Sequence, residues 1–333
     1  MINLNSLTTL SDPVIFVTTP QLKAAHRWDH FLVRLGVNRS CHRVMPGLYA
    51  LGKPTPDSPV FVTANYTLSF DALRSALAGI DGYILVLDTQ GVNVWCAAGK
   101  GTFGTQEIAL RVAATRLKEV VRHRTLILPQ LGAPGVTAHE VKKLTGFKVE
   151  YGPVRAADIG EYLKNHQAAP EMRRVRFTWW DRLVLIPVEV KAVLLPTLAV
   201  AAILYFLGGL VSSLAVITTV LAGTVLFPLL LPWIPTHNFS TKGFILGGLA
   251  ALPFAASVFL RHPDWAWWRQ LGQALAFLLG MPAVVAFLAL NFTGSSTFTS
   301  RTGVRKEIFT YIPAMAWTFG AGVVLAVIFA FLR

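Results

Sequence analysis

The C-terminal part of the chain is a series of long apolar stretches separated by short polar breaks. A helix needs about 20 apolar residues to cross a hydrocarbon core of about 30 Å, and only helices or closed barrels satisfy their backbone hydrogen bonds in lipid. Five stretches after Asp181 are long enough, at residues 185–207, 211–231, 243–260, 271–290 and 311–332. Residues 183–333 are therefore predicted to form an all-α bundle of about five transmembrane helices.

Charge separates this part from the rest of the chain. The sequence of 333 residues contains 30 lysines and arginines and 17 acidic residues, but residues 183–333 hold only eight and three of them. The first 182 residues have the composition of a soluble domain. A net charge of +13 is also typical of proteins that bind nucleic acid. Basic residues beside membrane spans explain this charge equally well, because they favour the cytoplasmic side and anionic lipid. We expect membrane lipid, and no nucleic acid, among the partners.

The distribution of lysine and arginine also predicts the orientation of the bundle, because these residues favour the cytoplasmic side. With the N-terminal domain inside, eight basic residues flank the spans on the inner side and three on the outer side. The N-terminus lacks the pattern of a signal peptide. We therefore expect a multi-pass protein of the inner (cytoplasmic) membrane with a cytoplasmic N-terminal domain. The expected interfacial anchors are Trp179, Trp180, Trp265, Trp267 and Trp268.

Residues 43–168 alternate between short apolar runs and helical patterns. Continuous apolar strands between helices are typical of a parallel sheet covered on both faces, and right-handed crossovers then give a doubly wound, Rossmann-like α/β domain. Strands are expected at 60–64, 83–88, 125–128 and 147–151, and helices at 69–79, 104–121, 137–144 and 155–164. Residues 1–42 are interpreted as an N-terminal segment and 169–182 as a basic and aromatic juxtamembrane linker.

Polar residues and glycines follow each predicted strand. Ligands of doubly wound sheets bind at the carboxyl ends of the strands, so these loops are candidate binding loops, although ordinary turn chemistry also explains their composition. They lack the G-x-G-x-x-G fingerprint and the Walker A lysine loop, which argues against NAD and ATP. The candidate residues are Thr63, Asn65, Thr67, Asp88, Gly132, Gly135 and Gly152.

One of these loops contains the segment Asn-Val-Trp-Cys-Ala-Ala-Gly-Lys at residues 93–100. Asn93 is expected to cap a short helix and Gly99 to end it. The two alanines after Cys96 are small enough to let a flat ligand approach the helix. The thiolate of Cys96 suits a soft, polarisable metal centre. The residues alone leave open the alternative of an inert, buried cysteine.

The octapeptide 93–100 resembles the cap-helix motif of the HgcA family, the membrane-bound corrinoid proteins of microbial mercury methylation. The predicted spans resemble that family's layout. Segments 46–73, 85–104, 128–159 and 291–307 resemble the corrinoid domain of the large subunit of the corrinoid iron–sulfur protein. That subunit has a four-cysteine cluster domain and no cysteine in its cap. This chain has two cysteines in all, too few for such a cluster.

The resemblance implies a base-off corrinoid (cobalamin or another cobamide) with Cys96 as lower axial cobalt ligand and catalytic residue. The strand-end residues named above would hold the edges and nucleotide tail of the corrinoid. The implied activity is a corrinoid-dependent methyltransferase that converts Hg(II) to methylmercury. The implied partners are a ferredoxin-like iron–sulfur reductant protein and a methyltetrahydrofolate-linked methyl donor. The cap would comprise Asn93, Val94, Trp95, Cys96, Ala97, Ala98, Gly99 and Lys100.

Other residues are expected to be ordinary. Cys41 lies outside the motif and is interpreted as structural. No D-x-H-x-x-G signature of a histidine ligand is present, so His30, His123 and His139 are expected to be surface histidines.

Two other functions stay open at this point. One is a membrane-anchored corrinoid methyl carrier in one-carbon or acetyl-CoA metabolism, which would use the same cofactor. The other is a transporter or membrane sensor. A transport path needs ionisable groups at mid-depth, whereas the main candidates, Glu189 and Lys191, lie near the inner end of the first predicted span. An anchoring role for the spans is therefore preferred.

Overall fold

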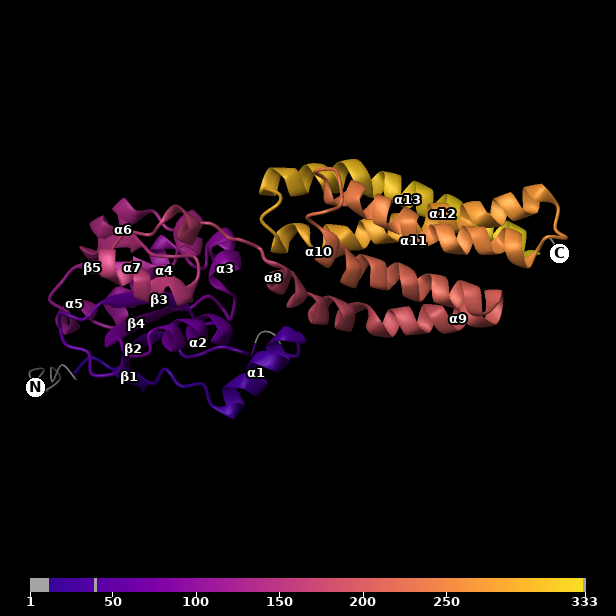
Figure 1. The fold of residues 1–333 in the computed structure, drawn as a ribbon. Helices are drawn as coiled ribbons and strands as arrows, with labels where there is room; N and C mark the ends of the chain where they lie inside the picture. The colour runs from indigo at the N-terminus through magenta and orange to yellow at the C-terminus, as the bar shows by residue number, and fades with distance from the viewer. Residues whose placement is uncertain (1–11, 39–40, 332–333) are drawn as a thin grey trace, which may run out of the picture. The chain divides into compact units, whose positions relative to one another are not determined.

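The computed structural model describes residues 12–38 and 41–331, which fall into two compact units. One unit, Met1–Val33 with Val37–Val175, is built on a six-stranded sheet, and the other, Arg34–Gly36 with Arg176–Arg333, is helical (Figure 1). At this level the structure confirms the predicted fold class, an α/β domain followed by a helical region.

The strands lie in the order β1-β2-β4-β3-β5-β6. All neighbouring pairs are parallel except β2 and β4, so the sheet is mixed, whereas the sequence predicted a parallel one. The segment 52–59 between β2 and β3 is too short for the crossover that a parallel return requires. The four predicted strands are confirmed, and two more precede them. The bounds are β1 Ile15–Thr18, β2 Gly47–Leu51, β3 Val60–Ala64, β4 Gly82–Leu87, β5 Thr125–Leu128 and β6 Lys148–Tyr151.

The central strands β3 and β4 are buried along their whole length. Successive residues point to opposite faces of a sheet, so Val60 and Val62 join one apolar cluster while Phe61 joins the other. Burial on both faces explains why these strands are continuous apolar runs. The helices that complete the clusters are α4 (Thr105–Ala114) and α6 (Ala138–Thr145) beside Val62, and α2 (Thr67–Ala76) and α7 (Ile159–Asn165) beside Phe61.

The helix predicted at 104–121 is interrupted. Arg116 adopts a left-handed backbone with φ of 49°, so α4 ends at Ala114 and the short α5 (Leu117–Val120) follows. The hydroxyl of Thr115 donates to the carbonyl of Arg111 at 2.8 Å. The apolar periodicity continues through the break, which is why the sequence pattern did not reveal it. Three 3₁₀ turns complete the unit, η2 (Gln130–Gly135), η3 (Ala156–Asp158) and η4 (Pro170–Arg173).

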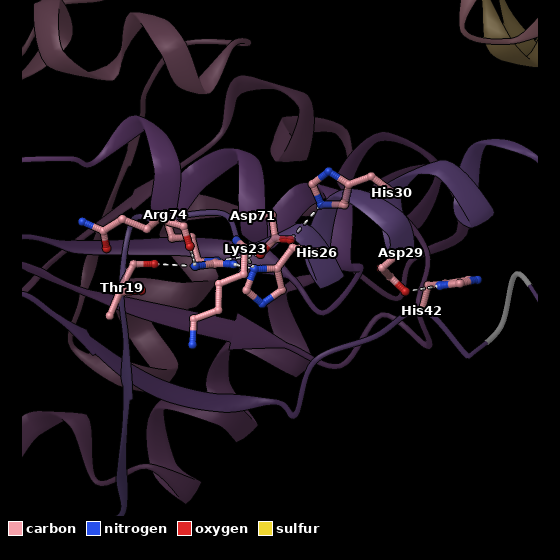
Figure 2. A network of polar contacts seen from close by, with 9 residues as sticks. Thr19, Lys23, His26, Asp29, His30, His42, Asp71 and Arg74 are labelled. Atoms are coloured by element: carbon pink, nitrogen blue, oxygen red, sulfur yellow. Dashed lines mark hydrogen bonds and ion pairs between the residues drawn. The ribbon is translucent and has the colours of Figure 1, made fainter.

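The helix α1 (Ala24–Arg34) is held to α2 by polar contacts (Figure 2). The carboxylate of Asp71, which is 5% exposed, accepts from Arg74 at 2.6 Å and pairs with His30 at 2.7 Å. Arg74 also donates to the backbone carbonyls of Thr19 and Gln21. Residues 12–33 are thus tied to the rest of the α/β unit through β1 and through this network. His30, expected to be an ordinary surface histidine, is half-buried and hydrogen-bonded to the Asp71 carboxylate.

A second histidine makes this attachment sensitive to pH. Both ring nitrogens of His42 lie 2.6 Å from oxygens, one on the Asp29 carboxylate and one on the Val37 carbonyl. Burial alone would lower the pKa of His42, but these hydrogen bonds favour the imidazolium and raise the pKa above its ordinary value of 6.5.

Because the folded-state pKa is raised, the stabilisation from His42 is fully present below about pH 6.5 and is lost as the pH rises through the folded value. We expect amide hydrogen exchange in α1, corrected for intrinsic rates, to be slower at about pH 6 than at about pH 8. The His42→Gln variant should lose this pH dependence. Equal corrected rates at both pH values in the unsubstituted chain would contradict the assignment.

The helical unit contains four segments long and apolar enough to cross a membrane, within the described residues: Trp179–Leu230, Phe239–Arg261, Trp267–Ser295 and Thr302–Phe331. The first has 52 residues and would be about 78 Å long if straight, more than twice the hydrocarbon thickness. Gly209 interrupts it with φ 75° and ψ −173°, at the break predicted from Gly208 and Gly209. The first two predicted spans therefore lie in one segment divided at that glycine.

The principal helices of this unit are apolar on the outside and closely packed inside. Phe206, Leu260 and Trp317 are each more than 80% exposed, as lipid-facing side chains are. A Cβ built on Gly243 or Gly247 would lie 2.5 Å from a backbone atom of α12, so these glycines allow α11 and α12 to approach closely. The helices are α8 (Trp179–Leu183), α9 (Ile186–Leu221), α10 (Phe227–Leu230), α11 (Phe239–Arg261), α12 (Trp267–Leu290) and α13 (Arg301–Phe331).

Two buried ionisable residues in this unit were not singled out from the sequence as buried groups. Glu307, 4% exposed, accepts hydrogen bonds from the backbone and hydroxyl of Ser240, each at 3.0 Å. Lys242, 6% exposed, donates to the carbonyls of Leu231 and Ile234. Both residues satisfy helix ends, which is a structural use of buried charge.

Candidate functional site

The carboxyl ends of β3, β5 and β6 border a cavity of about 330 Å³. Its lining includes Thr63 near the end of β3, Pro129 after β5 and Gly152 after β6. Asn93 and Trp95 contribute from the loop and helix that follow β4. The cavity is at the lower end of the size range of small-molecule sites. It lies at the sheet edge where the sequence placed the candidate binding loops.

The helix α3 (Val94–Lys100) beside this cavity carries Cys96. The side chain of Asn93 accepts from the backbone N–H of Cys96 at 2.9 Å, which confirms the predicted N-cap. The helix ends at Lys100, with Gly101 in the left-handed conformation at φ 86°, so Gly101 takes the position expected for Gly99. A Cβ on Gly99 would meet nothing within 4 Å.

The side chains of α3 divide between the domain core and the surface. Val94, Ala97 and Ala98 are buried in the cluster beside Val62, whereas Cys96 is a half-buried free thiol and Lys100 is exposed. The two alanines, which were expected to let a flat ligand approach the helix, are packed in the domain core in this structure. They lie about 100° and 200° around the helix from Cys96, on the side that η2 covers.

Two glycines after β5, Gly132 and Gly135, allow the close packing around α3. A Cβ on Gly135 would lie 2.9 Å from Cα of Ala98 and would also clash with the carbonyl of Phe103. A Cβ on Gly132 would lie 2.5 Å from the ring of Phe103. Gly135 therefore lets η2 approach α3 closely, and Gly132 leaves room for the Phe103 ring, so both glycines have a packing role beside the candidate site. Gly152 is different, because it lines the cavity.

Asn65 is fully used in shaping the loop that leads to α3. Its side-chain oxygen accepts from the backbone of Thr89 at 3.1 Å and of Gly91 at 3.0 Å, and from the Thr89 hydroxyl at 2.9 Å. Its amide nitrogen donates to Asp88 at 3.1 Å, and the same Asp88 oxygen accepts from the backbone of Gln90 at 3.0 Å. Asn65 and Asp88, predicted as ligand-binding residues, thus hold the turn that positions the cap helix.

Two buried polar atoms near this edge lack a hydrogen-bond partner among the residues that the structure describes. They are Oγ1 of Thr67, at the start of α2, and Oε1 of Gln130, at the start of η2. An unsatisfied buried polar group is costly, so both atoms are suited to a ligand's donors. Thr67 was predicted from the sequence; Gln130 was not, although a polar residue directly after a buried strand is the same signal.

A metal at this edge would need most of its ligands from elsewhere. Within residues 12–38 and 41–331, no three His, Cys, Asp or Glu side chains are placed to hold an ion together. Cys96 offers one soft ligand. The arrangement could therefore supply one thiol ligand to a metal that a cofactor already holds.

Comparison with known proteins relates this same region to subunits of one-carbon enzymes. Residues 37–163 match the family described as CO dehydrogenase/acetyl-CoA synthase delta subunit. The chain is 36% identical over 126 residues to acetyl-CoA decarbonylase/synthase complex subunit gamma of Archaeoglobus fulgidus, covering 37% of this chain and 26% of the relative. It is 30% identical over 129 residues to the corrinoid/iron-sulfur protein large subunit of Moorella thermoacetica, covering 38% and 28%.

The family match is confined to the α/β unit. It runs from just before β2 into α7 and includes the whole candidate site. The chain spans about a quarter of the length of these relatives. Residues 291–307, which were part of the sequence resemblance, lie outside the family match, as do α1 and the helical unit.

Proposed function

We propose that this chain is a membrane-anchored, corrinoid-dependent methyltransferase in which Cys96 is the lower axial ligand of cobalt and Hg(II) is the methyl acceptor. The observation that carries the proposal is the half-buried free thiol on the capped helix α3, at the carboxyl edge of the sheet. It lies inside the segment that matches corrinoid-protein subunits. The resemblance of residues 93–100 to the mercury family's cap motif favours Hg(II).

The residues at this edge fit part of a base-off corrinoid. A cavity of about 330 Å³ is too small for a whole corrinoid, so the ring would lie over α3 with only an appended group in the cavity. Thr67 and Gln130 present unpartnered polar atoms that can bond to the amide-bearing edge of the ring. Thr63 and Gly152 line the cavity.

When bound, the corrinoid would supply a cobalt centre able to carry a methyl group. The role of Cys96 is to donate electron density from its sulfur to that metal, as thiolates do in haem proteins. Such donation would suit methyl transfer to an electrophilic acceptor such as Hg(II). The two cysteines of this chain are too few for an iron–sulfur cluster. The electrons that reduce the cobalt would therefore come from a ferredoxin-like partner. The methyl donor would be linked to methyltetrahydrofolate.

A second candidate is a corrinoid methyl carrier in one-carbon or acetyl-CoA metabolism. The names of the matched relatives favour it, because they are acetyl-CoA decarbonylase/synthase subunits and a corrinoid/iron-sulfur protein. In either case the helical unit would anchor the site at the inner membrane, with the α/β unit in the cytoplasm.

Reconstitution tests both candidates. The purified full chain is incubated with a cobamide, and bound cobalt and the electron paramagnetic resonance spectrum of its Co(II) form are measured. We expect about one cobalt per chain and a base-off spectrum without nitrogen coupling. The chain whose bound cobamide has been methylated is then mixed with Hg(II) or with an acetyl-CoA-forming enzyme, and methyl transfer is measured. Methyl transfer to the acetyl-CoA-forming enzyme alone would reject mercury methylation in favour of the second candidate function. Absence of cobamide binding would reject both candidate functions.

A further inference from the structure

The helix α1 presents its aromatic side chains outward. Trp28 and Phe31 are 62% and 51% exposed, and their rings stack with centroids 5.4 Å apart. The side of α1 that faces the domain carries the buried Val33 and three polar residues, His26, Asp29 and His30, which make the contacts drawn in Figure 2. A helix on a soluble domain normally has the reverse arrangement, with aromatic residues inward and charged residues outward.

Basic residues surround the exposed aromatic pair. Arg27 and Arg34 are exposed on α1, and Lys23 is exposed just before it. Helical spacing places Arg34 next to Phe31 along the same face. Aromatic residues flanked by lysine and arginine are typical of helices that lie in the headgroup region of a bilayer and attract anionic lipid. Charge and apolarity on this face therefore both match a lipid surface.

The residues that end α1 belong to the helical unit. Arg34–Gly36 group with that unit, and a Cβ on Gly36 would lie 2.7 Å from Cγ2 of Val188, in the first turn of α9. This turn lies in the apolar segment that begins with Trp179 and Trp180, which are 61% and 56% exposed. Exposed tryptophans at the end of a span are typical of the membrane–water interface. Arg34–Gly36 therefore belong to the unit whose first apolar segment carries these tryptophans.

We propose that α1 is an interfacial helix that binds the surface of an anionic bilayer, with Trp28 and Phe31 among the acyl chains and Arg27 and Arg34 on the phosphates. The basic residues beside the aromatic pair favour anionic lipid over a second protein as the occupant of this face. The proposal rests on the membrane placement of the helical unit proposed above, but not on corrinoid binding. It concerns a segment that precedes residue 37, where the family match begins.

Photo-crosslinking in vesicles tests this proposal. The full chain with p-benzoylphenylalanine in place of Phe31 is reconstituted into vesicles of phosphatidylcholine alone or with phosphatidylglycerol, irradiated and digested for mass spectrometry. The peptide that contains position 31 should gain the mass of one phospholipid, with a yield roughly fivefold higher when phosphatidylglycerol is present. Leu144 of α6 is 52% exposed, and the same replacement there is the matched control, expected to give no lipid adduct.

A charge variant separates the contribution of the arginines. Adding Arg27→Glu and Arg34→Glu to the Phe31-labelled chain should reduce the adduct yield with phosphatidylglycerol to the level in phosphatidylcholine, at an unchanged unfolding temperature. The proposal is overturned by an inserted chain without a lipid adduct at position 31, by equal adducts at position 144, or by an adduct to a second protein. A chain that does not insert into vesicles would overturn the membrane placement, and this inference with it.

Discussion

Replacing Cys96 by alanine should lower the rate of methyl transfer by on the order of 100-fold or more, because loss of even an outer partner of a metal ligand costs about 10–100-fold. The fold should persist. Asn93 caps the backbone N–H of residue 96 rather than its side chain, and truncating a half-buried side chain costs less than about 1 kcal/mol when no cavity forms. The transfer rate to Hg(II) and the cobalt spectrum of the reconstituted chain measure the effect.

The matched control for this experiment is Cys41→Ala. Cys41 is an exposed free thiol outside the cap helix, so its variant should keep both the rate and the spectrum. Undiminished transfer by Cys96→Ala would refute the ligand role. A loss confined to Cys41→Ala would assign the chemistry to the other thiol.

Replacing Asn65 by alanine should destabilise the α/β unit by about 3 kcal/mol. Asn65 is 1% exposed, and its side-chain oxygen accepts from two backbone N–H groups and one hydroxyl in the loop before α3. Truncation leaves these buried donors without a partner, at about 1–3 kcal/mol for each unsatisfied group. Amide hydrogen exchange at Thr89 and Gly91, combined with denaturant unfolding of the full chain, measures the loss.

Asn165→Ala is the comparison variant, because Asn165 is exposed at the end of α7 and its truncation should change stability by less than about 0.5 kcal/mol. The Asn65 variant should also bind cobamide more weakly, since the loop that carries the Asn93 cap would be loosened. Unchanged exchange at Thr89 and Gly91 would show that the loop does not depend on Asn65.

Residue patterns identified the region of the candidate site but did not reveal that several of its members hold the fold together. The strand-end rule places Thr63, Asn65 and Gly152 at one edge, and local chemistry places Asn93 at the start of a helix. Each of these inferences depends only on residues that are close to one another in sequence. The inward turn of Ala97 and Ala98 depends on η2, which packs from more than 30 residues away and could not be read from the octapeptide.

The same distinction applies to ionisable residues. His30 and Asp71 are 41 positions apart in sequence, and Ser240 and Glu307 are 67 apart, so no local pattern relates them. Their pairing decides that the first histidine anchors α1 and that the glutamate completes a helix end.

The sequence by itself determined the features that depend on short-range periodicity and length: four strands of the sheet, apolar helices long enough for a bilayer, a break at Gly208 and Gly209, and a capped helix bearing Cys96. Only the tertiary structure decided how β1 and β2 extend the sheet, which side of α3 faces outward, and which polar groups are used up by the fold. Those outcomes follow from contacts between distant segments, whose partners are selected by packing and hydrogen bonding in three dimensions.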